Sequence, residues 1–444
     1  MAKGAEEHEG ENVKTTLNSE SAKAALGDLR KKNLAFMARY AGDSPRRQPV
    51  HTMYGGAHLF RADVSPYVGA LARKALEENA PDANSFAHAV SMAPALAEKV
   101  YPRVVEKLQR EPLEDFRIDF EDGYGNRKDS EEDGHAALVA HALAKGAAEG
   151  TLPPFIGMRI KPLTEELRAR SLRTLDIVLT ELMSVAKKLP ENFVVTLPKV
   201  QIPEQVSALV AVLEELEKGL NLPAKSIPFE IMIEQTQAIF DKDGHAMMPK
   251  LIDAAKGRCT GAHLGTYDYT ASCNITAAHQ HMLHPSCDFA KNVMQVTLGG
   301  TGVWLSDGAT NVMPVSHAGD HKTVHDAWRL HMQHTRHSLE TGFYQGWDLH
   351  PAQLPARFAA IYAFFLEALP AATTRLKNFI DKAAQATLVG DVFDDAATGQ
   401  GLLNFFLRGM SCGAIDEKEA LVTGLTLEDF RGRSFVKILE RRRA

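Results

Sequence analysis

Two apolar runs of strand length each lead to a carboxylate, and these two carboxylates are the residues best suited to chemistry. The run IPFEIMIE ends at Glu234, and the run HLGTYD ends at Asp268. In a parallel α/β protein, the carboxyl ends of the strands face the ligand crevice. Two hard oxygen ligands on neighbouring strand ends favour a divalent cation such as Mg²⁺, which keeps waters and accepts substrate oxygens. The pattern therefore predicts a metal-assisted enzyme.

A third acidic group follows another candidate strand, in the segment FRIDFEDG. Asp119 and Glu121 would point to one face of that strand and Asp122 to the other. Charges at the end of a buried strand require a metal, a cation or solvent. The alternative is a solvated acidic turn, and DFEDG in isolation favours that alternative.

Two basic residues lie at the ends of the next two candidate strands. Arg159 interrupts an apolar run, where an arginine is almost never fully buried without a partner. Its guanidinium could hold a substrate carboxylate through two hydrogen bonds or form a structural ion pair with the acidic residues, and these roles are compatible. Lys199 ends the run FVVTLPK and could form a Schiff base, bind a phosphate or carboxylate, or support the neighbouring carboxylates. We favour the last role.

Other motifs give weaker signals. The histidines between His325 and His337 share a predicted helix that lacks the glutamate of an HExxH site, so we expect surface or packing roles for them. A serine-nucleophile elbow, a P-loop and a dinucleotide fingerprint are absent. The glycine-rich run 299–302 precedes a strand, which makes it a weak phosphate cradle. The four cysteines match neither a disulfide framework nor a zinc spacing, and we expect buried free thiols.

The elements that must position these residues alternate between strand and helix. The candidate strands cover residues 50–55, 116–122, 155–160, 193–199, 229–234, 261–266, 301–306 and 346–350. Helical periodicity is clearest over 171–189 and 206–220. Eight strands that alternate with helices favour an α/β fold of the (β/α)8 TIM-barrel type over an open sheet.

Segments on both sides of the barrel complete the expected organisation. We expect an N-terminal tail and helix over 1–48, with the helix packed on the outside of the main domain. The TIM-barrel catalytic domain then covers 49–354, and a helical C-terminal extension covers 355–444.

Composition narrows the class of function. The net charge of −6 argues against a nucleic-acid-binding surface. The longest apolar stretch, 358–366, is too short to span a bilayer, and the N-terminal segment is acidic and polar, unlike a secretory signal. We therefore expect a cytoplasmic protein that acts on a small molecule and binds neither nucleic acid nor membrane.

Taken in chain order, these segments resemble the citrate lyase β-subunit-like family of the HpcH/HpaI aldolase superfamily, as a divergent member. FRIDFEDGYGNRK is similar to that family's DLEDAV segment, VVTLPKVQIPEQV to LPKVESPEDV, and GAHLGTYDYTASCNI to FGxEDYxxxLG. ETGFYQGWDLHPAQL is similar to GFxGKxxIHPxQ, and LVGDVFDDA to the late GxMIDxP motif. The similarities run in order from about residue 50 to residue 405.

The resemblance implies a TIM barrel that binds Mg²⁺, or Mn²⁺, through Glu234 and Asp268. Arg159 would hold the carboxylate of a 2-oxo acid or a related acid. Glu121 and Asp122 would lie beside the metal or the arginine.

The resemblance also implies a catalytic acid or base near the C-terminus, often delivered by a neighbouring subunit. Asp394 matches that residue, and Asp391 and Asp395 are close enough to leave the register open. A homo-oligomer follows from the same likeness.

The activity implied is that of a Mg²⁺-dependent carbon–carbon lyase or aldolase. It would act on a 2-oxo acid, a hydroxy acid or its CoA thioester through a metal-stabilised enolate. The alternatives are a CoA-thioester hydrolase or phosphoenolpyruvate-type transferase on the same barrel, and a non-catalytic binding relative.

Overall fold

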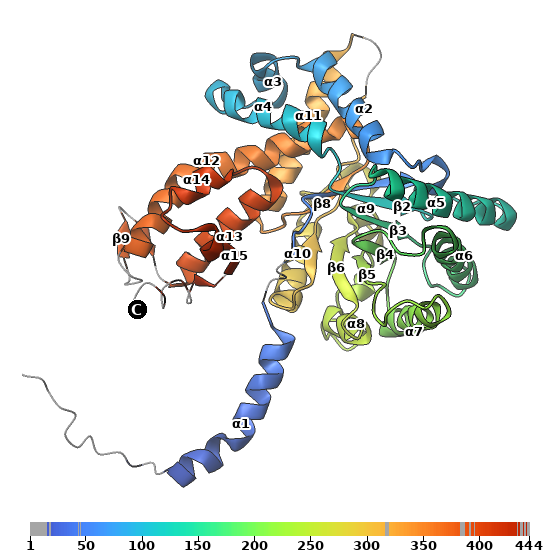
Figure 1. Cartoon of the computed structure of the whole chain (residues 1–444), viewed down its shortest axis with the longest axis horizontal. Coiled ribbons are helices and arrows are strands. Elements are labelled where there is room, and N and C mark those ends of the chain that lie inside the picture. Colours follow the sequence, from blue (N-terminus) through green and yellow to red (C-terminus); the bar gives the residue numbers. More distant parts are fainter. Residues whose placement is uncertain are drawn as a thin grey trace, which may run out of the picture.

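A barrel of eight parallel strands forms the centre of the computed structural model (Figure 1). The structure describes residues 16, 19–42, 44, 46–315, 319–381, 387–389, 392–394, 396–432, 434, 435, 438 and 441. The barrel strands are β1 (His51–Gly56), β2 (Asp115–Asp119), β3 (Phe155–Arg159), β4 (Phe193–Leu197), β5 (Phe229–Ile233), β6 (Cys259–Leu264), β7 (Trp304–Ser306) and β8 (Gly346–Asp348). Each overlaps a strand predicted from the sequence.

The strands pair in chain order from β1 to β7, and β8 pairs with the other edge of β1. The barrel closes just after β7, where a parallel bridge joins Ala309 to Trp347 of β8. Beside this bridge the Trp347 N–H donates to the Gly308 carbonyl at 2.9 Å. The predicted α/β TIM barrel is therefore confirmed.

Helices surround the barrel in the expected alternation. Three of them fill the long connection between β1 and β2: α2 (Val64–Asn79), α3 (Ala83–Val90) and α4 (Pro94–Arg110). The others that follow barrel strands are α5 (Asp129–Glu149), α6 (Arg168–Ala186), α7 (Pro203–Gly219), α8 (Met248–Ala254), α9 (Thr266–Ser272), α10 (Pro285–Leu298) and α11 (His321–Glu340). Short 3₁₀ turns occupy η1 (Ala57–Leu59), η2 (Thr236–Ala238), η3 (Ala277–His279) and η4 (Pro351–Gln353).

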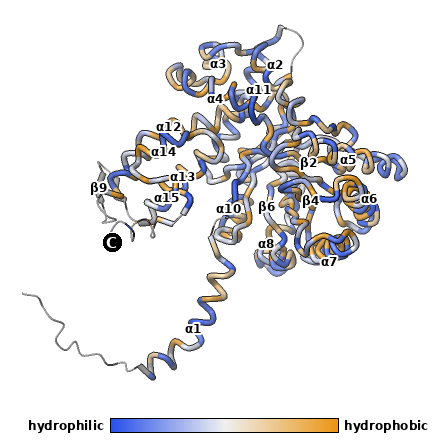
Figure 2. Tube along the Cα trace, in the orientation of Figure 1, coloured by the Kyte–Doolittle hydropathy of each residue, from blue (hydrophilic) through white to orange (hydrophobic). Residues whose placement is uncertain are grey.

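Burial explains why these segments adopt these forms. Every residue of β2, β3, β4 and β5 is buried, as expected for strands covered by side chains inside the barrel and by helices outside it. In α7 the residues Val206, Leu209, Val210 and Leu213 recur at helical spacing and face the core. Figure 2 shows the corresponding mixture of apolar and polar segments along the helices around the barrel.

A helical lobe follows the barrel. It contains the long helix α12 (Leu354–Asp381), a hairpin of β9 (Thr387–Val389) and β10 (Val392–Asp394), and the helices α13 (Ala396–Cys412), α14 (Glu417–Leu421) and α15 (Leu427–Gly432). The segment Pro351–Ile380 is long and apolar enough to cross a membrane by length and composition alone. Because 61% of its apolar window is buried inside the molecule, it also has the character of a core helix.

The N-terminal helix α1 (Ser19–Arg39) forms where it was predicted but projects away from the barrel (Figure 1). Leu26, Phe36 and Met37 are 55–64% exposed, so the prediction that this helix packs on the main domain is wrong for its described side chains. The contacts with the body lie near its C-terminal end, where Arg39 pairs with Asp253 at 2.6 Å.

Candidate active site

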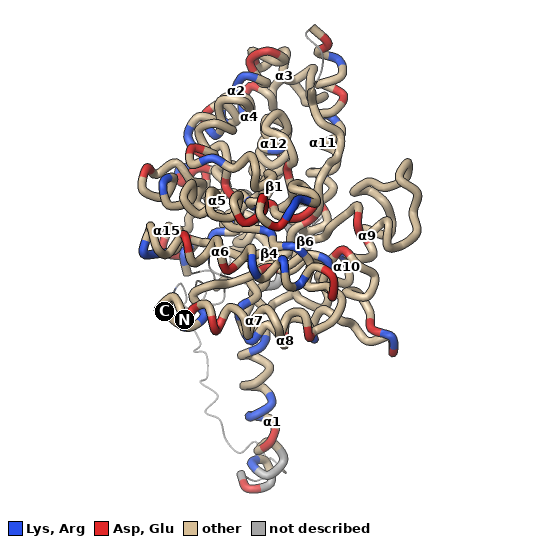
Figure 3. The backbone as a smooth tube through the Cα atoms, turned by 90° about the vertical axis from the view of Figure 1, so that its right-hand side faces the viewer, with Lys and Arg blue, Asp and Glu red and all other residues tan. Residues whose placement is uncertain are grey.

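The residues singled out in the sequence gather at the carboxyl ends of neighbouring strands. Asp119 and Arg159 are the last residues of β2 and β3, and Glu234 directly follows β5. Lys199 follows β4, and Asp268 lies in the first turn of α9 after β6. Figure 3 shows acidic and basic segments side by side near the labels of β1 and β6. We refer to these five residues, together with Glu121 and Asp122 after β2, as the mouth cluster.

Of the two carboxylates that were predicted to bind metal, Glu234 is the more deeply buried. It is 1% exposed, and its Oε1 accepts the backbone N–H of Lys199 at 2.6 Å. Gly265 provides the space for this side chain, because a Cβ at that position would collide with the carboxylate. Burial raises the pKa of Glu234 to about 8, although the nearby Lys199 ammonium acts in the opposite direction. This carboxylate therefore lacks full charge compensation.

The Lys199 ammonium lies among the other carboxylates of the cluster. It forms ion pairs with Glu121, with Asp122 at 3.1 Å and with Asp268 at 3.1 Å. Burial lowers the pKa of Lys199, but the charges of Glu234 and Glu121 outweigh burial and raise it well above the ordinary value. The backbone of Lys199 has a φ of +49°, a left-handed conformation that is uncommon outside glycine. The hydrogen bond to Glu234 holds the backbone in this conformation.

Arg159 is buried and paired with the acidic segment after β2. Its Nε and Nη2 donate to the two oxygens of Asp119 at 2.7 and 2.6 Å, and its Nη1 lies 3.2 Å from Glu121 Oε2. The guanidinium also lies over the ring of Tyr54, 4.9 Å from its centroid. The structural ion pair is thus present, and one edge of the guanidinium is occupied by Asp119. The Glu121 side of the same guanidinium faces the other carboxylates.

The segment DFEDG forms a turn organised by Asp119 rather than a solvated acidic turn. Asp119 accepts the backbone N–H groups of Glu121 at 2.9 Å and of Gly123 at 2.7 Å. Glu121 is 8% exposed, and burial raises its pKa to about 7. The Asp122 side chain is 58% exposed, so only this residue fits the solvated alternative.

The charges of the mouth cluster fit a divalent cation. Five carboxylates surround the two cations Arg159 and Lys199, so the cluster carries an excess of negative charge. Thr266 Oγ1 is a buried oxygen without a hydrogen-bond partner, and Glu121 Oε2 makes no hydrogen bond and meets Arg159 Nη1 only as an ion pair at 3.2 Å. A set of hard oxygen donors with uncompensated charge is the environment that Mg²⁺ and Mn²⁺ prefer. Glu234 and Asp268 would hold such an ion.

A second acidic group lies on the loop after β5 and has a simpler explanation. Ligand atoms of Asp241, Asp243 and His245 lie within 4.8 Å of one another. Asp241 accepts the backbone N–H groups of both other residues and pairs with Lys250 at 2.5 Å. The two outer residues are exposed. These contacts organise the loop without a metal.

The predicted acid or base lies far from the mouth cluster along the same chain. Asp394 ends β10, and its hairpin contacts α12 and α13 at the outer end of the helical lobe (Figure 1). Asp391 and Asp395 lie outside the described residues, as does the side chain of Asp394. The reason is the length of α12, whose 28 residues extend about 42 Å.

Sequence reasoning missed the aromatic residues beneath Arg159. The rings of Tyr54 and Trp347 stack with centroids 4.3 Å apart, on the adjacent strands β1 and β8. Trp347 Nε1 also lies 3.2 Å from His263 Nδ1 inside the barrel. The only signal in the sequence is an aromatic residue in each of two weak candidate strands. The predicted packing role of the helix α11 histidines agrees with the hydrogen bonds of His331 and His334 to Thr310.

One protein family matches most of the chain. Residues 29–438 match the family described as Domain of unknown function (DUF6986). The chain belongs to this family. No curated protein matches it.

One solved structure shares the fold, and a second aligns more weakly. The crystal structure of a citrate lyase from Burkholderia xenovorans LB400 is 18% identical, with a TM-score of 0.56, and the match covers 86% of this chain and 99% of that chain. At this identity the likeness shows a common fold. The magnesium/glyoxylate complex of Haloferax volcanii malate synthase aligns at 14% identity with a TM-score of 0.44, over 89% of this chain and 98% of that chain.

Proposed function

We propose that this protein is a Mg²⁺- or Mn²⁺-dependent carbon–carbon lyase or aldolase, a divergent member of the HpcH/HpaI superfamily. Its substrate would be a 2-oxo acid, a hydroxy acid or the CoA thioester of such an acid. The observation that carries the proposal is the mouth cluster, in which four carboxylates pair with Arg159 or Lys199 and a fifth, Glu234, accepts the backbone N–H of Lys199. The structural likeness to a protein solved as a citrate lyase supports the barrel part of the proposal.

Glu234 and Asp268 would hold the metal in this proposal. When bound, the ion would supply Lewis-acid stabilisation of negative charge on a substrate carbonyl. Glu234 is oriented by the Lys199 N–H, and Asp268 remains partly open to solvent with a side chain 34% exposed. Because Glu234 is buried and Asp268 is partly exposed, a substrate could approach the metal from the side of Asp268.

Arg159 and Lys199 would bind and orient the acidic substrate. Asp119 fixes the guanidinium plane of Arg159, so its positive charge has a set direction. A substrate carboxylate would compete with Glu121 for the remaining N–H groups of Arg159 and for the Lys199 ammonium. Both cations would also stabilise the negative charge that develops during bond cleavage.

Proton transfer would belong to another residue. In the cleavage direction a base removes the proton of the substrate hydroxyl, and the electron pair of the breaking C–C bond moves toward the neighbouring carbonyl. We assign this role to Asp394 of a second subunit, since the hairpin that carries it lies at the outer end of the lobe. The proposal therefore includes a cytoplasmic homo-oligomer.

Substitution of the metal carboxylates tests the proposal. Full-length protein is first screened for turnover and thermal shift with Mg²⁺, Mn²⁺ or EDTA together with oxaloacetate, pyruvate, glyoxylate or acetyl-CoA. We expect Glu234→Ala and Asp268→Ala each to reduce metal-dependent turnover by at least about 100-fold. The control is Glu106→Ala, because this exposed carboxylate lies on α4 and pairs with Arg110 of the same helix.

The same experiment separates the alternatives. Wild-type activity in either variant would reject the metal assignment. A response to acetyl-CoA alone would favour the thioester hydrolase, and the lack of any metal response or turnover would favour a non-catalytic binding relative.

A further inference from the structure

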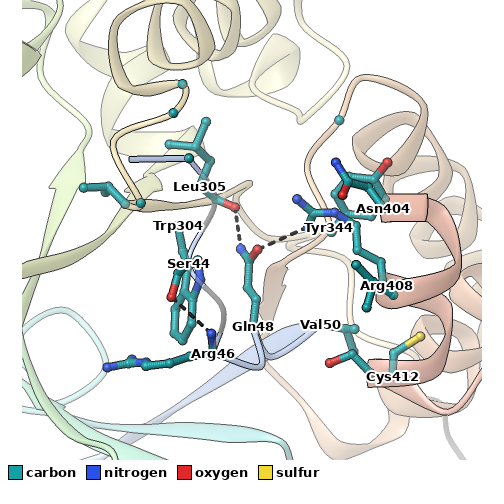
Figure 4. Close-up of a pocket in the computed structure, with 18 of the residues that line it drawn as sticks. Ser44, Arg46, Gln48, Val50, Trp304, Leu305, Tyr344, Asn404, Arg408 and Cys412 are labelled. Carbon is teal, nitrogen blue, oxygen red and sulfur yellow. Dashed lines mark hydrogen bonds between the residues drawn. The ribbon is translucent and has the colours of Figure 1, made fainter. Parts of the chain in front are cut away.

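A second cavity lies at the opposite end of the barrel from the mouth cluster. Its volume is about 670 Å³, and its walls include residues that precede β1, β7 and β8 (Figure 4). Helices α12 and α13 of the C-terminal lobe form the other side. Because the barrel strands are parallel, their amino ends lie away from the carboxylates described above. We refer to this space as the basal cavity.

The described lining of the basal cavity is basic. Its lining includes Arg46, Arg408 and Arg431, and the described lining residues include no aspartate or glutamate. The whole chain has 56 acidic and 50 basic residues, so a described lining with three arginines and no acidic residue is a local departure from its composition. Low-dielectric walls around such charges concentrate the potential that attracts anions.

Aromatic rings hold two of these arginines. The Arg46 guanidinium lies 4.7 Å from the ring centroid of Trp304, and that of Arg408 lies 4.0 Å from the ring centroid of Tyr344. Stacking fixes the plane of a guanidinium while its N–H groups stay directed outward along its edge. This arrangement suits bidentate recognition of a carboxylate or phosphate.

Amides add polar groups between the arginines. Gln48 donates to the Leu305 carbonyl at 3.1 Å and accepts from Arg408 Nη1 at 3.4 Å (Figure 4). It also donates to Gln345 Oε1 at 3.1 Å. Asn404 lies one turn before Arg408 on α13 and also lines the cavity. The amide of Gln48 therefore anchors the end of Arg408 to the barrel.

The glycine-rich run 299–302 also lines the basal cavity. Gly300 and Gly302 have φ values of +76° and +79°, which side-chain-bearing residues rarely adopt. The loop thereby brings its backbone to the cavity wall without side chains between. Val303, Leu339, Ile361, Phe365 and Leu407 form apolar parts of the wall, and Ser44, Gln400 and Ser411 add polar groups to it.

We propose that the basal cavity binds a small organic anion. The phosphate or carboxylate of the ligand would contact Arg408 and Arg431, and its planar or apolar part would lie against the apolar walls. The volume is within the range of small-molecule sites. This site is independent of the proposed lyase activity, since it shares no residue with the mouth cluster.

Calorimetric titration of the full chain tests the proposal with three probes: ADP, inorganic phosphate and octanoate. ADP combines phosphates with a flat ring, whereas octanoate combines a carboxylate with an apolar chain. Tighter binding of ADP identifies a phosphate ligand, and tighter binding of octanoate identifies a carboxylate ligand. We expect at least one of these two to bind more tightly than inorganic phosphate, because the apolar walls contribute.

Variants locate the binding. Arg408→Gln and Arg431→Gln should each weaken the best probe at least 10-fold, and Arg168→Gln should change its affinity less than 2-fold. Arg168 is an exposed arginine on α6 that pairs with Glu165. Arg431 is also exposed, so its variant keeps the test usable if Arg408→Gln fails to fold.

Three results would overturn the proposal. The first is that none of the three probes binds, and the second is that the best probe binds equally well to the arginine variants. The third is a change of oligomeric state in these variants, measured by sedimentation without any probe bound, which would make the cavity a contact between subunits.

Discussion

The two ends of the barrel carry opposite charge. At the mouth cluster, five carboxylates face Arg159 and Lys199. At the basal cavity, three arginines line a space whose described walls include no acidic residue. The scaffold thus separates an environment suited to a cation from one suited to an anion, and the predominant charge of the described lining indicates the class of ligand at each end.

The two ends also differ in how their charges are held. Arg159 and Asp119 are buried and joined by two short hydrogen bonds, so removal of either leaves a charge without a partner. Arg46 and Arg431 are exposed to solvent and can hydrate when their surroundings change. Substitutions should therefore affect stability more at the mouth cluster than at the basal cavity.

The largest effect on stability is expected for Asp119→Ala. This change leaves the Arg159 guanidinium buried without its bidentate partner and removes the acceptor that organises the turn at Glu121 and Gly123. We expect the free energy of unfolding, measured with urea, to fall by about 3–5 kcal/mol. Arg431→Gln at the other end should change it by less than about 1 kcal/mol. Equal effects at both ends would contradict the comparison.

A smaller effect is expected from the titration of Glu234 in the presence of EDTA. Its pKa in the folded protein, about 8, lies above the ordinary value of 4.5. Between these values the folded state keeps a proton that the unfolded state has released, so stability decreases as the pH rises from about 5 to 8. In Glu234→Gln the free energy of unfolding should fall less over this pH range, by about 2 kcal/mol. Urea unfolding at several pH values measures the difference. If the free energy of unfolding depended on pH in the same way in both proteins, the raised pKa of Glu234 would be contradicted.

The smallest of these effects is expected for Lys199→Met. Loss of the ammonium leaves Glu121, Asp122 and Asp268 without their shared cation, and we expect a loss of about 1–2 kcal/mol at pH 8. Mg²⁺ should then raise the melting temperature of this variant more than that of the wild type. Lys145→Met on α5 is the matched control, because that lysine is 66% exposed and pairs only along its helix. A variant that Mg²⁺ does not stabilise would speak against a cation site.

The barrel could be predicted because each strand can be recognised from its own local sequence. Runs such as FVVTL in β4 and FEIMI in β5 are apolar throughout, since both of their faces are covered. The gathering of Glu234, Asp268 and Arg159 at one end followed from the parallel arrangement. An ion pair of Arg159 with the acidic residues was one of the two roles expected from the sequence. The choice of Asp119 as the bidentate partner did not follow, because it depends on the register between β2 and β3.

Other features depend on contacts between distant parts of the chain. The arginines of the basal cavity occupy positions 46, 408 and 431, and only the packing of the lobe against the barrel brings them together. The glycine-rich run 299–302 is a weak phosphate-binding motif by sequence alone, and its place in the cavity wall depends on the fold. The exposure of α1 was missed because local periodicity defines a helix without defining what covers it.

Titration of the full-length protein with Mn²⁺ tests the central claim most directly. Calorimetry should detect one site in the wild type and binding at least about 100-fold weaker in the double variant Glu234→Gln/Asp268→Asn. The variant keeps side chains of nearly the same size, so the loss would reflect the ligands and not the packing. Equal Mn²⁺ affinity in the two proteins would contradict the assignment of Glu234 and Asp268 as the metal ligands.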